Sequence, residues 1–178
     1  DELAQRLVTA ADRLTEARTA AGERLASTVE GELAQLGMAG ARVEIAVDPR
    51  TDDTGATLPG AEGERRVGAD GADTVEIRVA ANRGSEPRSV AKAASGGELS
   101  RIMLAIEVAT AGSARAQVPT FVFDEVDAGV GGRAGLDVGA RLAALARTSQ
   151  VIVVTHLAQV AAHADRHLVV HKSHEDQV

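Results

Sequence analysis

From Ser95 onward the chain alternates helix-like and strand-like segments, and no other feature constrains its fold as much. A helical pattern over residues 97–111 precedes the apolar strand 120–123, and a second helical pattern over residues 134–147 precedes the apolar strand 151–155. Neither strand alternates apolar with polar residues, which is typical of strands covered by helices on both faces. The alternation predicts an α/β fold built on a mainly parallel sheet that helices flank.

A short helix near residues 157–164 and a last strand over residues 167–170 are expected to follow. Before Ser95 the pattern differs. Residues 42–47 and 74–79 alternate Val and Ile with charged or small residues, which predicts a pair of half-buried strands, antiparallel to each other. Residues 48–73, between them, are rich in Gly, Asp and Pro and have no apolar period, so we expect a long, exposed and mobile loop there.

Residues 1–36 are expected to form one long helix that ends at Gly37. Its apolar positions repeat at spacings of about four and seven: Leu3, Leu7, Leu14, Ala21, Leu25, Val29, Leu33 and Leu36. Two interpretations remain open. The helix either packs on its own domain or is the returning end of a coiled-coil arm.

The composition is that of a single globular domain, because the chain has 178 residues and 44% of them are hydrophobic. It has no cysteine, which excludes disulfides and thiolate metal sites and is typical of a cytoplasmic protein. No apolar run approaches the roughly 20 residues of a membrane span. The chain starts without Met, already inside a helical pattern, so we expect a piece of a longer protein.

The formal net charge of −7 argues against a surface that is basic overall. Contact with nucleic acid would need a local patch or a neighbouring segment. The local basic clusters are Arg65 with Arg66, and Arg83 with Arg88 and Lys92. For each cluster we favour a solvated surface.

Residues 95–98, Ser-Gly-Gly-Glu, stand at the start of the helix predicted over residues 97–111. Ser95 and Glu98 have the spacing of a capping box. A cap does not explain Gly96 and Gly97, since each glycine costs roughly 0.5–1 kcal/mol relative to alanine within a helix. Bare amides at a helix N-terminus bind anions, so we favour a phosphate site and keep capping alone as the alternative.

Two acidic residues, Asp124 and Glu125, directly follow the strand 120–123, at the end where open α/β sheets bind ligands. One carboxylate can hold Mg²⁺ through water, and the other can orient the water that attacks a phosphoryl group. His156 directly follows the strand 151–155, and in a parallel sheet it would lie beside these acids. A solvated acidic turn and a surface histidine are the alternatives.

The stretch "DAGVGGRAG", from Asp127, is a glycine-rich turn. It is not a phosphate-binding Walker A loop, because no G-x-x-x-x-G-K-[ST] pattern occurs in the chain. The remaining histidines have no matching carboxylate spacing, so we expect surface residues rather than a zinc site.

Together these stretches resemble the second half of an ABC-type ATPase head. "SGGELSR" resembles the signature motif, "FVFDEVD" the Walker B strand with its catalytic Glu, "DAGVGG" the D-loop, and His156 the switch histidine. Within that superfamily the chain resembles the SMC-like ATPases of bacterial DNA repair, from about Asp73 to Lys172. The resemblance implies a C-terminal head lobe over residues 37–178, with residues 1–36 as the end of a coiled-coil arm.

The resemblance also implies roles for these residues. Asp124 would help to coordinate Mg²⁺, Glu125 would polarise the attacking water, and His156 would contact the γ-phosphate of ATP. The signature residues would bind ATP held mainly by a second head, and Asp127 would communicate across that dimer interface. The cofactor-binding set is therefore Ser95, Gly96, Gly97, Glu98 and Asp127.

The function implied is ATP hydrolysis in DNA double-strand-break repair, by a protein in the cytoplasm at the nucleoid. Its partners would be its own N-terminal head half, a second head and DNA, with no membrane. The chain by itself is expected to be inactive because it lacks Walker A. Two alternatives remain: a non-catalytic head module that binds DNA or partners, and the nucleotide-binding subunit of an ABC transporter.

Overall fold

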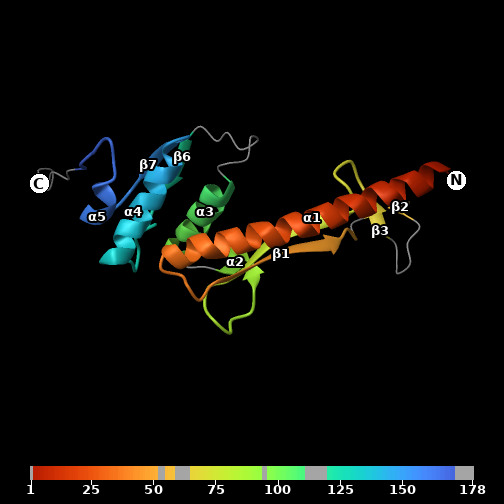
Figure 1. Ribbon diagram of the computed structural model, residues 1–178, viewed down its shortest axis with the longest axis horizontal. Helices are drawn as coiled ribbons and strands as arrows, with labels where there is room; N and C mark the ends of the chain where they lie inside the picture. The colour runs from red at the N-terminus through yellow and green to blue at the C-terminus, as the bar shows by residue number, and fades with distance from the viewer. Residues whose placement is uncertain (1, 52–54, 59–64, 94–95, 111–119, 171–178) are drawn as a thin grey trace, which may run out of the picture.

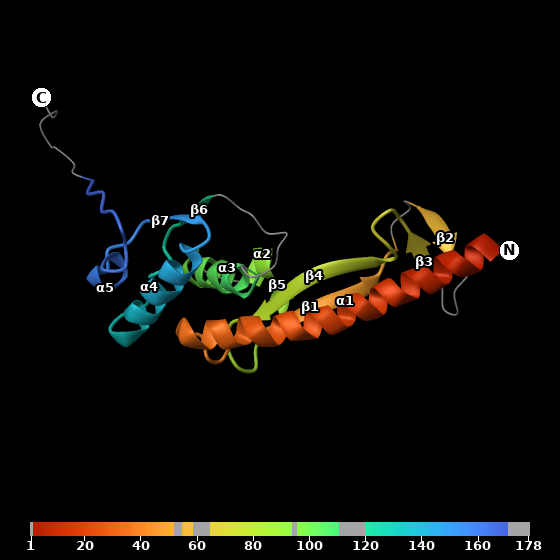
Figure 2. The same ribbon diagram turned by 45° about the horizontal axis from the view of Figure 1, so that its top comes forward.

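The computed structural model describes residues 2–51, 55–58, 65–93, 96–110 and 120–170 of the chain. The molecule is elongated along its first helix, α1 (Glu2–Gln35), which confirms the helix predicted over residues 1–36. Helices gather at the C-terminal end of α1, and a small hairpin lies beside its N-terminal end (Figures 1 and 2). We call these the head end and the far end.

The head end holds the main apolar core. The C-terminal half of α1 packs there with α3 (Gly96–Thr110) and α4 (Arg133–Leu145), which confirms both helices expected after Ser95. Leu33, Leu36 and Ile102 are each 0% exposed. A short helix, α5 (Ala158–Ala161), packs against α4. Because the chain has no Trp or Tyr and only two Phe, close packing of Leu, Ile, Val and Ala forms most of this core.

The strand pair predicted before Ser95 is confirmed and is antiparallel. β1 (Arg42–Pro49) pairs with β4 (Asp73–Ala80), with Val43 opposite Val79. β4 also pairs with β5 (Arg88–Ser89), which leads into the one-turn helix α2 (Val90–Ala93). The sheet lies along α1, and a Cβ added at Gly22 would come within 3.0 Å of the Ile45 Cβ. The buried position on this part of α1 is therefore Gly22, while Ala21 is exposed.

The expectation of an exposed loop over residues 48–73 is wrong for the part that the structure describes. β2 (Ala56–Leu58) and β3 (Arg65–Val67) form an antiparallel hairpin beside α1. Leu58 and Val67 are buried against α1 residues including Ala11. These strands show no apolar period because each has three residues and buries only one of them.

At the far end, a polar network joins the hairpin and the start of β4 to α1. Asp73 is 5% exposed and accepts hydrogen bonds from the Thr15 hydroxyl at 2.7 Å and from Nη1 of Arg18 at 3.1 Å. Arg65 of β3 lies 3.5 Å from the same carboxylate and 2.6 Å from Asp12. The start of β4 and the hairpin are thus tied to α1 through charge as well as apolar contact.

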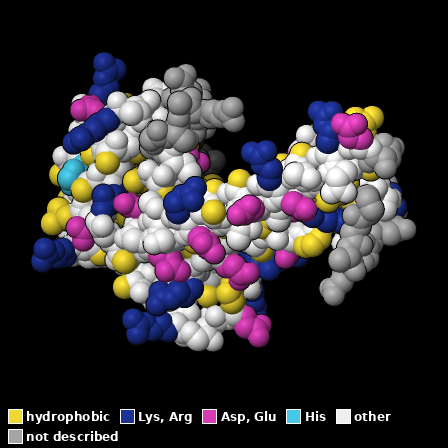
Figure 3. Space-filling model, turned by 45° about the vertical axis from the view of Figure 1, so that its right-hand side comes forward, with side chains coloured by type: hydrophobic (Ala, Val, Ile, Leu, Met, Phe, Trp, Pro, Cys, Tyr) yellow, Lys and Arg dark blue, Asp and Glu magenta, His cyan; other side chains and the backbone are white. Residues whose placement is uncertain are grey.

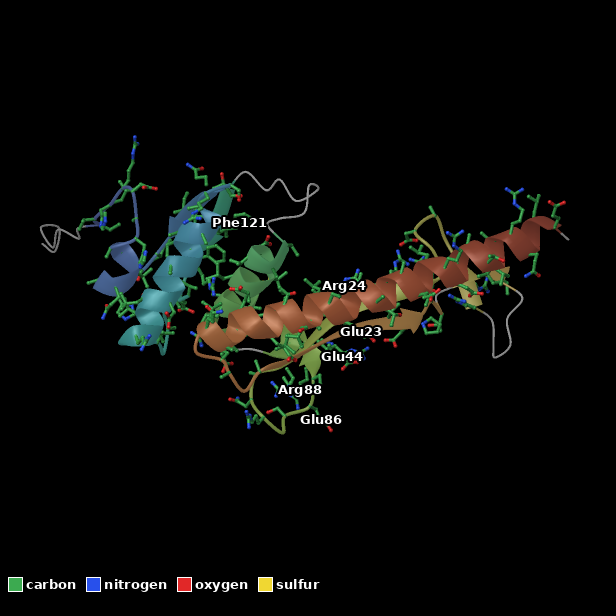
Figure 4. The ribbon with its side chains drawn as sticks, in the orientation of Figure 1. Glu23, Arg24, Glu44, Glu86, Arg88 and Phe121 are labelled. Carbon is green, nitrogen blue, oxygen red and sulfur yellow. The ribbon has the colours of Figure 1, made fainter. Side chains whose placement is uncertain are left out.

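The two strands expected after Ser95 form a parallel pair, as predicted. β6 (Thr120–Phe123) and β7 (Gln150–Val153) run side by side with Phe123 opposite Val153. The expectation that helices cover both faces is wrong for this chain: Val122 is 68% exposed and Ile152 is 47% exposed. Phe121, labelled in Figure 4, packs on the core instead and stacks on Phe123, with ring centroids 6.2 Å apart.

The strand predicted over residues 167–170 is also wrong, because these residues have no regular structure and Leu168 is 94% exposed. Nothing else in the described part of the chain pairs with them. None of the described helices is long and apolar enough to cross a membrane.

Candidate functional site

The acids and the histidine singled out from the sequence meet at one edge of the parallel pair. Asp124 and Glu125 follow β6 directly, and His156 lies three residues beyond the end of β7. The pairing continues past the strands, since the Val154 N–H donates to the Phe123 carbonyl at 2.9 Å. The sequence-based prediction that these segments are neighbours is therefore confirmed.

Glu125 has an unusual backbone. Its φ of 57° makes it the one non-glycine residue with positive φ among the described residues. A residue with a Cβ is disfavoured in this left-handed region by about 1–2 kcal/mol. The conformation turns the exposed Glu125 side chain toward the N-terminus of α3, where its carboxylate lies directly against Gly96. An anion is stabilised at such a helix end.

The glycines at the start of α3 have a packing role as well. A Cβ at Gly96 would meet the Glu125 carboxylate. A Cβ at Gly97 would lie 2.7 Å from the Ala128 Cβ and 3.1 Å from the carbonyl oxygens of Glu125 and Ala128. Both residues therefore let α3 sit against the turn that follows β6. Capping by Ser95 lies outside the described residues.

Two further residues of α3 hold that turn, although the sequence motifs predict no role for either. The Ser100 hydroxyl donates to the Asp124 carbonyl at 2.6 Å. Arg101, 8% exposed, donates through Nη1 to the Ala128 carbonyl at 2.7 Å. Burial lowers the pKa of Arg101, and the charge of Glu98 partly offsets this. A charged residue on the otherwise apolar face of a helix was the available signal, because such a side chain is buried only when it has a partner.

Asp127 is turned inward, and its predicted role in communication across a dimer interface stays a prediction. It is 3% exposed, and its Oδ2 accepts hydrogen bonds from the Thr155 hydroxyl and, at 3.2 Å, from the His156 N–H. Burial alone would raise the pKa of Asp127. The hydrogen bonds from Thr155 and His156 outweigh this effect, and its pKa lies below the usual value.

The donor set at this edge fits magnesium better than zinc. Asp124 and Glu125 are both exposed, and Oδ1 of Asp124 accepts the Glu125 N–H at 2.9 Å. Within the described residues, no group of three or more His, Cys, Asp or Glu side chains is arranged to hold a metal. Mg²⁺ takes one or two carboxylates and keeps several waters, whereas zinc needs three or four protein ligands.

The surface around this edge is partly apolar. A groove runs beside α3, and it is lined by Leu99, Ser100, Met103, Glu107, Phe121, Val122 and Phe123. Between the head end and the far end, acidic side chains gather on the face that Figure 3 draws.

Comparison with known proteins gives one consistent set of relatives. No protein-family model matches the chain. "DNA repair protein RecN" of Streptomyces coelicolor is 52% identical over 180 residues, which cover 100% of this chain and 30% of that protein. RecN of Mycobacterium leprae is 54% identical over 97% of this chain and 30% of its own length. RecN of Treponema pallidum is 42% identical over 87% of this chain and 25% of its own length.

Solved structures that resemble the chain include SMC heads. An Smc head domain with an extended coiled coil, from Pyrococcus furiosus, has a TM-score of 0.53 at 22% identity, and the match covers 80% of this chain and 30% of that one. An Smc head domain with a coiled coil and joint, from Pyrococcus yayanosii, has a TM-score of 0.51 at 22% identity over 80% of this chain and 23% of its own. At this identity the likeness shows the fold alone.

The chain spans less than a third of the length of the RecN proteins it matches. Its α/β fold is the fold expected from the motif order. Along its whole length, then, the chain is similar to a part of RecN, and 80% of it matches the fold of a part of an SMC head.

Proposed function

We propose that the chain is the C-terminal head lobe of an SMC-type ATPase that acts in DNA double-strand-break repair. The observation that carries this proposal is that Asp124, Glu125 and His156 follow two adjacent parallel strands, with the Glu125 carboxylate directly against Gly96 at the start of α3. The RecN-like sequence over the full chain supports the same function. ATP would be bound jointly with the N-terminal head half and with a second head.

Each residue then has a role at the γ-phosphate. Glu125 would polarise the attacking water, and His156 would hydrogen-bond to the phosphate or to that water. Asp124 would hold Mg²⁺ through water, and the ion would neutralise phosphate charge. The exposed positions of all three side chains suit contact with a ligand that arrives from outside this chain.

The N-terminus of α3 would bind ATP carried mainly by the second head, through Ser95, Gly96 and Gly97. Because Glu125 lies against Gly96 here, the arriving phosphate would compete with this carboxylate for the helix end. Glu125 would then be repelled toward the water at its own site. Residues 37–178 form the head lobe in this proposal.

Residues 1–36 would be the end of the coiled-coil arm. The N-terminal half of α1 supports this, since Leu3 is 71% exposed and Leu7 is 40% exposed on the part of the helix farthest from the head. A partner helix from upstream would cover them. DNA would be bound by the assembled protein, in the cytoplasm at the nucleoid.

The test is ATP turnover by the full-length protein with and without Glu125→Gln. Turnover should fall at least a hundredfold, because a base or water-orienting group contributes about 10²–10⁴-fold. Head dimers that hold ATP should accumulate, as measured by size and bound nucleotide. The isolated 178-residue chain should show no turnover, because its sequence has no Walker A pattern to bind the β-phosphate.

Asp137→Asn is the matched control, since Asp137 is exposed on α4 and is not one of the proposed site residues. It should leave turnover unchanged. Wild-type turnover in the Glu125→Gln variant would contradict the proposed role of Glu125. Turnover by the purified chain alone would contradict the proposal that ATP is bound jointly with the N-terminal head half.

A further inference from the structure

The Asp127 carboxylate is held firmly in place. Its own backbone lies in a turn closed by two hydrogen bonds, from the Ala128 N–H to the Glu125 carbonyl at 3.0 Å and from the Val130 N–H to the Asp127 carbonyl at 3.1 Å. The neighbouring Val126 is 0% exposed and anchors the turn in the main core. The carboxylate is therefore a fixed point, and the segment after β7 is arranged around it.

His156 meets this carboxylate twice. Its backbone N–H donates to Oδ2 of Asp127 at 3.2 Å, and its ring atom Nδ1 lies 3.3 Å from the same oxygen. The hydroxyl of Thr155 also donates to Oδ2, and it accepts the Leu157 N–H at 3.1 Å, so the backbone on both sides of His156 is fixed. The imidazole itself is 76% exposed, so the rest of the ring faces outward.

A carboxylate beside Nδ1 decides which ring nitrogen of a neutral histidine carries the proton. A proton on Nδ1 is attracted to Oδ2, whereas a lone pair on Nδ1 would be repelled by it. With the proton on Nδ1, Nε2 carries the lone pair and can accept a hydrogen bond from water. Asparagine in place of Asp127 would keep an acceptor oxygen, and alanine would remove it.

We propose that Asp127 is the positioning residue for His156: it fixes the Nδ1–H tautomer and the ring orientation, so that Nε2 is presented to the attacking water of its own head. The inference rests on the proposed function for the role of Nε2. The contact that carries it lies entirely within this chain. Asp127 thus acts in its own head through His156 and not by reaching into a second head.

The first experiment reads the tautomer directly and needs no activity. Full-length protein is labelled with ¹⁵N-histidine, and the His156 signals are identified by their loss in His156→Gln. At alkaline pH, long-range ¹H–¹⁵N correlations should show the Nδ1–H form for His156 in the wild type. Asp127→Ala should shift it to the Nε2–H form, which dominates in free histidine, and Asp127→Asn should largely retain Nδ1–H.

The wild-type spectrum tests the proposal even if the Asp127→Ala variant does not fold. An Nε2–H tautomer in the wild type overturns the proposal, as does the same tautomer ratio in wild type and folded Asp127→Ala. A wild-type protein without ATP turnover would refute the proposed function, while the tautomer measurement would still stand.

The second experiment is a double-mutant cycle on kcat. Asp127→Ala should lower kcat by about 10- to 100-fold, the range found when carboxylates that orient metal-bound histidines are removed. In a His156→Gln background, Asp127→Ala should cause no further loss, since glutamine at 156 has no ring for Asp127 to orient. Asp137→Ala, at an exposed aspartate, is the control and should change neither background. An equal loss from Asp127→Ala in both backgrounds would mean a merely structural role.

Discussion

The two ends of α1 are held in place by different kinds of contact. At the head end, Val29, Leu33 and Leu36 are at most 1% exposed and lie in a core that α3, α4 and the strands share. At the far end, Ala11 is the buried α1 residue of a small cluster, and Asp73 supplies much of the attachment. One helix thus joins an apolar core to a mainly polar contact.

The difference indicates how the head end and the far end contribute to the free energy of folding. Apolar burial at the head end is non-directional and is shared among many neighbours. The far end depends on a few directional contacts with one carboxylate, whose loss leaves polar groups without partners. The head end should therefore decide whether the chain folds, and the far end whether the hairpin stays on α1.

The largest effect is expected from Leu33→Ala at the head end. Leu33 is 0% exposed, so the change leaves a cavity and should lower the free energy of unfolding by about 2–5 kcal/mol. Urea denaturation of the 178-residue chain measures it. Leu7→Ala, at a 40% exposed position near the far end of the same helix, is the control and should stay within about 0.5 kcal/mol of wild type. Equal losses in the free energy of unfolding at both positions would contradict the conclusion that the head end decides whether the chain folds.

Asp73→Asn tests the far end. The neutral amide weakens the contacts with Arg18 and Arg65, and the free energy of unfolding should fall by about 1–3 kcal/mol. Amide hydrogen exchange gives the sharper measurement: Leu58 and Val67 of the hairpin should lose protection while Ile102 keeps it. Loss of protection at Ile102 to the same extent would show that the two ends unfold as one unit.

A pair of glycine substitutions tests how closely the head end is packed. Gly97→Ala would push a methyl group against the backbone of Glu125 and Ala128, which should cost about 1–3 kcal/mol. Gly31→Ala, in an open position of α1, should instead stabilise the chain by about 0.5–1 kcal/mol. Thermal unfolding of both variants checks the opposite signs. Stabilisation by Gly97→Ala would mean that α3 is not seated against this turn.

The smallest effect is expected at a surface pair of the far end. The Arg50 guanidinium hydrogen-bonds to Asp70 at 2.9 and 3.1 Å and lowers the pKa of that carboxyl below its usual 3.8. Since the folded-state pKa is depressed, the pair stabilises the fold above pH 3.8 and loses this effect as the pH falls through the folded-state pKa. An NMR titration of Arg50→Gln should show the pKa of Asp70 rising toward 3.8. An unchanged pKa of Asp70 in Arg50→Gln would show that Arg50 does not lower it.

The sequence predicted the elements that have a strong period of their own. α1, β1, β4 and the order α3, β6, α4, β7 follow from spacings within each segment. The hairpin of β2 and β3 does not, because its buried residues, Leu58 and Val67, are fixed by α1 residues more than forty positions away along the chain. Residues 167–170 look like a strand, yet no described strand lies beside them.

At the site, the sequence predicted which residues lie there but not which way their side chains point. Asp124, Glu125 and His156 were chosen because each follows an apolar strand. That Asp127 points inward could not be foreseen, since it depends on Thr155 and His156 of another strand end. Arg101 stands out in the sequence as a charged residue on an apolar helix face, but its partner could not be predicted, because that partner is a backbone carbonyl, which every residue offers.

In the proposed function, the left-handed backbone of Glu125 would set stability and activity against each other at one position. A chain selected for folding alone would carry glycine there, because glycine adopts this conformation without a steric penalty. Turnover supported by the Glu125 carboxylate, as we propose, would therefore depend on a native state kept slightly less stable than its sequence length and core would allow. A screen for thermostable variants of this segment should find Gly at 125 among its winners, and those winners should be the ones that have lost catalysis.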